Sequence, residues 1–302
     1  MTEDITTIIH KGFSTWKRNL AICVPFILEI LATFVLFIIF MMFFLMLFIF
    51  PKISAVGVDP QQLSPEEFLA VISSLLSGSI WPLVALGVVF VLIYMFLQSF
   101  FMAGAIGMSK EASQRGDTSL RDMSAYGMRN VVSLFLVKIL MLLLALAGIV
   151  FMIPGILSIG DLGTLLNDPQ QAIAGTSMLF FGFLIWGFYL LAISIVLIFV
   201  QYALVVENLD PVSAIEKGVA VFMSNKSGAL ALWIILIAIS LFMQLLGEIA
   251  GFIDVVAQVW SLVNPILAFI VIPTLTTIWW TRLYLNRNGQ KLYSLEDYIF
   301  DH

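Results

Sequence analysis

Two charged residues, Glu29 and Lys138, lie inside long apolar runs of the sequence. Charged side chains are rare within membrane-spanning segments, so each is a functional-site hypothesis by default. Glu29 follows Asn19 by ten residues and Lys138 follows Asn130 by eight, which places the two charges at depths of ~15 Å and ~12 Å in helices that begin at those asparagines. Neighbouring helices would therefore bring them together, either as a buried ion pair or as a polar centre that binds an ion, a headgroup or a metabolite. A third interpretation is that the Lys138 side chain reaches up to the membrane surface.

Three uncharged polar residues are further candidates inside apolar runs: Gln98, Gln201 and Tyr202. Amides between membrane helices usually hold the helices together, each contributing ~0.6 kcal/mol. The alternative is that they contact a substrate. Tyr202, and Tyr94 with it, could join either kind of network.

Motifs for catalysis are absent from the sequence. It contains no HExxH, GxSxG, phosphate-binding loop or dinucleotide fingerprint. Cys23 is the single cysteine, and His10 and His302 are the two histidines. Nothing therefore supplies a nucleophile or a metal beside Glu29 and Lys138, and we predict a protein that is not an enzyme and has no metal or cofactor.

The composition predicts an integral membrane protein. Of 302 residues, 61% are hydrophobic and 11% are charged, and the mean hydropathy is +1.08. A soluble domain has ~25% charged residues. The net charge of −5 also speaks against a nucleic-acid partner, which requires a basic face.

Six apolar runs are long enough to cross a bilayer as helices, since ~20 residues suffice. Because these runs lack the alternation of a barrel, an all-α polytopic membrane protein is expected. Twelve of the 14 basic residues lie on one side: they precede span 1, connect spans 2 and 3 or spans 4 and 5, or end or follow span 6. Both termini are therefore predicted to be cytoplasmic in the cell membrane. The runs are Leu20–Phe50, Ile80–Met108, Val131–Leu157, Ser177–Val206, Gly228–Gly247 and Val259–Leu285.

The segments before spans 1, 3 and 5 resemble one another, which predicts an internal threefold repeat. Residues 5–16 and 211–222 each carry an apolar stripe at helical spacing, and the segment 119–130 is a fainter copy. Each unit would be an amphipathic helix at the cytoplasmic surface followed by a two-span hairpin, and the three hairpins would be parallel. One domain, 1–302, would thus contain units of about 1–108, 117–206 and 210–285 and a tail, 286–302.

Small polar residues mark the ends of these amphipathic helices. Asp210, with Pro211 after it, predicts an N-cap. Asn19, Asn130 and Asn225 stand at the entry to each hairpin, and we predict that they cap the incoming span rather than contact a ligand. A short amphipathic helix is also predicted after Ser64, in the loop between spans 1 and 2.

The stretch Val205-Val206-Glu207-Asn208-Leu209-Asp210-Pro211-Val212-Ser213-Ala214-Ile215, ending at Asn225 before a span, resembles a membrane domain fused to some glycerophosphodiester phosphodiesterases. It is also similar to stand-alone bacterial and archaeal membrane proteins of unassigned function. The resemblance is strongest over residues 200–240 and implies a fold and topology, with a hint of lipid-related work. It carries over no catalytic residue.

The leading functional prediction is a non-enzymatic membrane protein that binds or organises membrane lipids or other membrane proteins. Three amphipathic helices on one leaflet motivate it. The alternative is a transporter or channel for a small polar or lipid-like substrate, with its site near Glu29 and Lys138.

Overall fold

The computed structural model describes residues 3–51, 80–159 and 169–293. Within these residues the chain is all-helical, without strands. The predicted helix after Ser64 lies outside the described residues. The elements are α1 (Ile5–Arg18), η1 (Leu20–Cys23), α2 (Val24–Phe44), η2 (Leu45–Ile49), α5 (Ile80–Arg115), α6 (Leu120–Ala147), η4 (Gly148–Met152), α7 (Ile153–Ile159), α9 (Pro169–Val196), α10 (Val200–Glu207), α11 (Pro211–Ser224), α12 (Lys226–Ala250), α13 (Asp254–Ile266), η5 (Leu267–Val271) and α14 (Ile272–Arg287).

Six helical stretches are long and apolar enough to cross a membrane, which confirms the predicted number and the all-α membrane fold class. They are Leu20–Ile49, Ile80–Arg115, Leu120–Ser158, Gly175–Glu207, Lys226–Ala250 and Asp254–Arg287. Each predicted apolar run falls on one of them.

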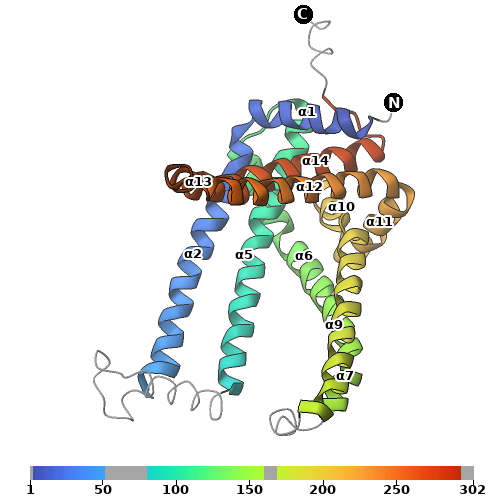
Figure 1. Cartoon of the computed structure of the whole chain (residues 1–302). Coiled ribbons are helices and arrows are strands. Elements are labelled where there is room, and N and C mark those ends of the chain that lie inside the picture. Colours follow the sequence, from blue (N-terminus) through green and yellow to red (C-terminus); the bar gives the residue numbers. More distant parts are fainter. Residues whose placement is uncertain (1–2, 52–79, 160–168, 294–302) are drawn as a thin grey trace, which may run out of the picture.

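The six stretches do not all run in one direction. In the view of Figure 1, α2 and α5 extend alongside each other, and α6 and α9 extend toward the same end, whereas α12, α13 and α14 run across them. This differs from the expectation of three equivalent hairpins. Core packing accompanies the crosswise direction of α14, which buries Trp280 and Tyr284, whereas α13 contains no buried residue.

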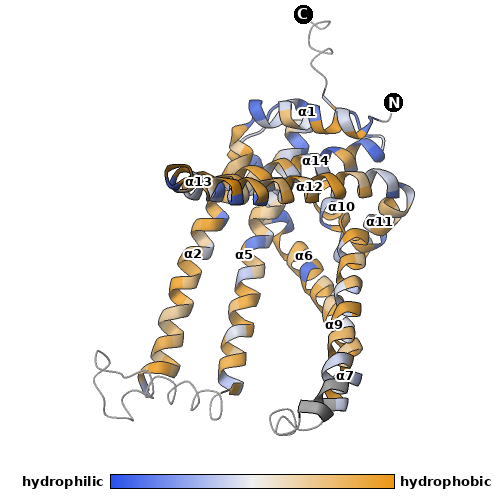
Figure 2. Cartoon of the chain, viewed as in Figure 1, coloured by the Kyte–Doolittle hydropathy of each residue, from blue (hydrophilic) through white to orange (hydrophobic). Residues whose placement is uncertain are grey.

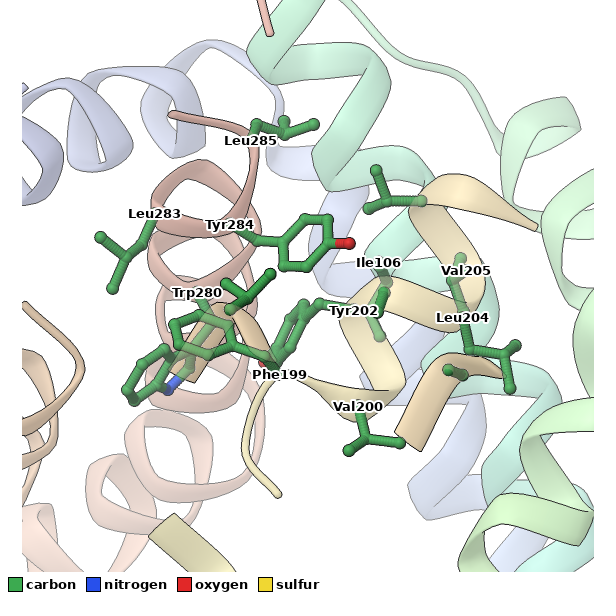
Figure 3. Packing of buried hydrophobic residues seen from close by; sticks show 14 of the residues in the cluster. Ile106, Phe199, Val200, Tyr202, Leu204, Val205, Trp280, Leu283, Tyr284 and Leu285 are labelled. Atoms are coloured by element: carbon green, nitrogen blue, oxygen red, sulfur yellow. The ribbon is translucent and has the colours of Figure 1, made fainter. Parts of the chain in front are cut away.

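The core lies where α5, α6, α10, α11 and α14 meet, at the end of the molecule near α1. Figure 3 shows side chains from α5, α10 and α14 packed together there, among them Phe199, Tyr202 and Trp280. Away from this core the helices expose apolar side chains (Figure 2): Phe34 of α2 is 62% exposed and Phe181 of α9 is 61% exposed. A bilayer would cover such surface.

Aspartates cap the N-termini of the amphipathic helices α1 and α11, and the sequence predicts the second of these caps. The Asp210 carboxylate accepts hydrogen bonds from the backbone N–H groups of Val212 (3.1 Å) and Ser213 (3.2 Å), which confirms this N-cap. At the start of α1, the Asp4 carboxylate accepts a hydrogen bond from the backbone N–H of Thr7. These caps satisfy N–H groups that have no partner inside the helix.

The prediction that the three asparagines cap the incoming span is wrong. Each side-chain amide instead donates to the carbonyl four residues earlier: Asn19 to Thr15 (3.1 Å), Asn130 to Tyr126 (2.9 Å) and Asn225 to Val221 (3.0 Å). Asn19 and Asn225 leave helical geometry and end α1 and α11. Free carbonyls at a helix end need donors, and the amide supplies one.

The predicted break at Asn130 is also wrong, because α6 runs without interruption from Leu120 to Ala147. The residues that follow Asn130, Val131 to Phe135, include no glycine or proline to end a helix. The amphipathic segment of the second unit is therefore the first part of a spanning helix.

Close approaches join each amphipathic segment to an earlier or later helix. A Cβ at Gly12 of α1 would lie 2.4 Å from Trp279 Cδ1 of α14, and a Cβ at Gly218 of α11 would lie 2.7 Å from the Val200 Cα of α10. Between α5 and α6 glycines stand on both sides: a Cβ at Gly104 of α5 would lie 2.7 Å from Met123 Cγ, and a Cβ at Gly127 of α6 would lie 2.8 Å from Phe100 Cε2.

Candidate functional site

The two intramembrane charges and one of the amides come together from three helices. Lys138 Nζ on α6 donates to Gln98 Oε1 on α5 at 2.9 Å. Gln98 and Lys138 both interact electrostatically with Glu29 on α2. Glu29 and Lys138 are therefore neighbours, as their spacing predicts, but Gln98 bridges them in place of a direct ion pair.

A cavity of about 620 Å³ lies beside this bridge, between α2, α5, η5 and α14. Its polar wall consists of Glu29, Gln98, Tyr94 and Thr33. Lys138 is not part of the lining and reaches the site through its hydrogen bond to Gln98. The rest of the lining is apolar: Phe26, Ile30, Phe34, Phe37, Phe90, Met102, Phe269 and Pro273.

The chemistry of this cavity is that of an amphiphile site. A carboxylate has about four lone-pair positions, and the Gln98 amide can fill at most two of them, so the Glu29 carboxylate retains capacity for a ligand hydroxyl or amine. The aromatic wall provides apolar contact for a hydrocarbon chain.

Gln201 and Tyr202 do not belong to this site. Tyr202 is 1% exposed, and its hydroxyl interacts with the side chains of Gln201 and of Thr277 on α14. No hydrogen bond joins this group to Glu29, Gln98 or Lys138 within the described part of the chain. The interaction holds α10 against α14, which agrees with the interpretation of membrane amides as interhelical contacts.

Sequence reasoning missed a polar cluster that joins the two ends of the chain. Arg282, 1% exposed, donates to both carboxylate oxygens of Glu3 at 2.9 and 2.8 Å, and Lys11 donates to Glu3 at 2.9 Å. Burial by itself would raise the pKa of Glu3, but the hydrogen bonds and charges of Arg282 and Lys11 outweigh burial, so the pKa of this carboxyl lies below its ordinary value. The feature of the sequence that could have indicated this cluster is Arg282, an arginine inside the mostly apolar stretch Thr277–Leu285.

These features define a multi-pass α-helical membrane protein with a polar bridge in its membrane-spanning part. The chain belongs to the family described as a domain of unknown function, DUF7847, whose profile matches residues 67–283. It is also similar to an uncharacterized protein of Archaeoglobus fulgidus, 26% identical over 300 residues that cover 95% of this chain and 97% of the relative. No solved structure matches the chain. These comparisons support an uncharacterised family and do not show the link to glycerophosphodiester phosphodiesterases.

Proposed function

We propose that this protein is a non-enzymatic membrane protein that binds a lipid or lipid-like amphiphile in the cavity beside Glu29 and Gln98. The observation that carries the proposal is the lining of that cavity, which is polar at one wall and aromatic elsewhere. The hydrocarbon chain would lie along Phe34, Phe37 and Phe90, and a hydroxyl or amine would hydrogen-bond Glu29.

The position of the bridge supports a binding role. Charged side chains in a membrane are costly, and those that occur there usually face the interior or a cavity and mark a functional site. Glu29 lines an open cavity, while Lys138 and Gln98 hold it in place from α6 and α5. Membrane lipids are therefore the proposed partners, in keeping with the lipid-related role that the resemblance of residues 200–240 implies.

The threefold repeat is part of this proposal, and the close approaches support it. Each amphipathic segment packs on the outgoing helix of another unit: α1 on α14, α6 on α5 and α11 on α10. The contacting residues of the outgoing helices are Trp279, Gly104 and Val200. The three pairs together would close a ring.

A second set of contacts repeats in the same order. A side chain that can hydrogen-bond stands seven residues after each contact residue: Asn286 after Trp279, Glu111 after Gly104 and Glu207 after Val200. Asn286 accepts from the Glu3 backbone N–H, Glu111 from the Tyr126 hydroxyl, and Glu207 forms an ion pair with Lys217 at 3.8 Å. Each partner lies in or just before the amphipathic segment that packs on the same outgoing helix: Glu3 stands before α1, Tyr126 lies in α6 and Lys217 lies in α11. The location that we propose for this ring is the cytoplasmic face of the cell membrane, with both termini in the cytoplasm.

The test is lipid retention, measured by native mass spectrometry of the protein released from lipid nanodiscs. Wild type is expected to keep a bound lipid, and Glu29→Gln and Gln98→Leu are expected to lose it about tenfold, since a hydrogen bond to a charged group contributes ~1.5–3 kcal/mol. Gln258→Leu is the matched control, because Gln258 is an exposed glutamine of α13 outside the cavity.

Equal retention in wild type, Glu29→Gln and Gln98→Leu would contradict the proposal. The transport alternative predicts a different outcome: substrate flux into liposomes that Glu29→Gln abolishes.

A further inference from the structure

A second group of polar side chains in the candidate spanning helices has no partner among the described residues. Gln244 and Glu248 of α12 and Asn264 of α13 form no side-chain hydrogen bond or ion pair with any described residue. All three line one cleft of about 560 Å³ between α12, α13 and η5. The cleft shares no lining residue with the cavity beside Glu29.

Helical spacing places the polar groups of each helix on one face, and both faces line the cleft. Ser240, Gln244 and Glu248 follow at intervals of four on α12, and Trp260 and Asn264 do so on α13, so each set shares one helix face. The indole of Trp260 lies against Gly247, where a Cβ would be 3.0 Å from Trp260 Nε1. The absence of a side chain at Gly247 thus lets the indole form a wall of the cleft beside Glu248.

Lipid alone is a poor occupant for such a cleft. The pair of helices is predominantly hydrophobic (Figure 2), and α12 and the stretch with α13 are both long and apolar enough to span a membrane. A polar group that faces hydrocarbon without a hydrogen-bond partner costs several kcal/mol. An occupant that supplies hydrogen-bond donors and a positive charge removes this cost.

We propose that the cleft binds the primary ammonium group of an amphiphilic molecule. Glu248 supplies the opposite charge, the side-chain oxygens of Gln244 and Asn264 accept N–H donors, and the Trp260 ring supplies a cation–π surface. A primary ammonium has three donors for these acceptors, whereas a quaternary ammonium has none. An anionic ligand does not fit, because the lining contains Glu248 and no lysine or arginine.

The apolar remainder of the lining, which includes Met243, Ala268 and Ile272, suits the carbon atoms next to the ammonium group. The ammonium could belong to an ethanolamine lipid or to a free amine. Both offer the same chemistry, and the experiment distinguishes them.

The experiment measures lipids retained by the full-length protein from nanodiscs made of equal amounts of phosphatidylethanolamine and phosphatidylcholine. Wild type is expected to retain phosphatidylethanolamine over phosphatidylcholine by about tenfold, the effect of one charged hydrogen bond. Glu248→Gln is expected to remove this preference. Asp254→Asn, a matched change in the same helix pair but outside the cleft, is expected to keep it.

Free ethanolamine, added to nanodiscs of phosphatidylcholine alone, separates the two sources. Binding of ethanolamine that depends on Glu248 supports a free amine as ligand, and a preference for the lipid without such binding supports the headgroup. Should Glu248→Gln fail to fold, Asn264→Leu replaces it, with partial loss of the preference expected. Equal retention of both lipids by wild type together with no ethanolamine binding would overturn the proposal, as would a dimer of this chain that Glu248→Gln dissociates.

Discussion

At the scale of single residues, the cluster of Glu3, Lys11 and Arg282 joins helices that are distant in the sequence. The Arg282 guanidinium holds Glu3 by two hydrogen bonds, and Lys11 adds a third. Breaking a buried pair is more damaging than replacing the whole pair, because the remaining charge has no partner. The N-terminal segment is therefore bound to α14 by electrostatics as well as by packing.

Glu3→Gln should lower the stability by about 3 kcal/mol, because the buried guanidinium of Arg282 then lacks a counter-charge. Thermal unfolding in detergent measures the change. Glu216→Gln is the control, since Glu216 is exposed on α11 and forms no ion pair with a described residue; an equal loss of stability in both variants would show that the Glu3 contacts are not responsible.

The same pair predicts a pH dependence. The folded-state pKa of Glu3 lies below the ordinary value of 4.5, so the stabilisation is fully present above that pH and is lost as the pH falls through the folded-state pKa. The difference in stability between wild type and Glu3→Gln should therefore narrow in acid. Unfolding midpoints measured from neutral pH downward test this; a difference that stays constant at all pH values contradicts it.

The bridge of Glu29, Gln98 and Lys138 allows stability to be separated from binding. Lys138→Met alone removes the donor to Gln98 Oε1 and the positive charge near Glu29, and should destabilise the protein by about 1–3 kcal/mol. Replacing all three with apolar residues, as Glu29→Leu, Gln98→Leu and Lys138→Met, should restore most of that stability and still abolish lipid retention. Thermal unfolding and native mass spectrometry on the same samples give both quantities. Full retention of lipid in the triple variant would show that the bridge is purely structural.

At the scale of helices, small residues set how closely the surface helices approach the others. Gly12 lies against Trp279 with no room for a Cβ, and the indole N–H of Trp279 donates to the Ile9 carbonyl at 3.2 Å. The spacing of Gly12 and Asn19 matches that of Gly218 and Asn225, so both helices use the same design.

Gly12→Ala should destabilise the protein by about 1–3 kcal/mol, the usual effect of overpacking. Gly87→Ala on α5 is the matched control, because a Cβ there would meet no atom within 4 Å and should add up to about 1 kcal/mol through helix propensity. Unfolding in detergent compares the two. A Gly12→Ala variant as stable as Gly87→Ala would show that α1 does not pack closely on α14.

Many of the helix boundaries could be predicted from the local sequence. Asp210 with Pro211 identified the start of α11, and the apolar stripe identified α1, because caps and periodicity depend on neighbouring residues. The continuity of α6 through Asn130 could not be predicted in this way. An asparagine ends a helix or remains inside it according to the backbone around it, and its i−4 hydrogen bond is compatible with both.

At the scale of the whole molecule, hydropathy predicted six spans because the length of an apolar run is a local property. The spacing after Asn19 and Asn130 predicted that Glu29 and Lys138 lie near each other, and the structure brings them together, although α6 begins at Leu120 and not at Asn130. The role of Gln98 as the bridge and the contact between Glu3 and Arg282 were not predictable, since both depend on how distant helices are arranged. The direction of α12 and α13 was not predictable for the same reason.

The membrane topology can be tested by cysteine labelling in a Cys23→Ser background. Cysteines placed at the exposed residues Asp4, Asp117 and Glu216 should all react with an impermeant maleimide from the cytoplasmic side. A cysteine at Phe252, 86% exposed between α12 and α13, should react from the opposite side if the third hairpin crosses the bilayer. Reaction of Phe252→Cys from the cytoplasmic side would show that this helix pair stays on one face.

The most direct test of amphiphile binding is photolabelling by a lipid that carries a diazirine in its acyl chain, in nanodiscs, with the labelled residues mapped by mass spectrometry. Cavity residues Phe34 and Phe37 are 62% and 50% exposed, and Phe181 and Phe183 of α9 are 61% and 54% exposed outside the cavity. A bound lipid predicts several-fold more label on Phe34 and Phe37, reduced to the level of α9 by Gln98→Leu. Equal labelling of the two pairs in wild type would contradict a specific site and leave only the ordinary lipid-facing surface.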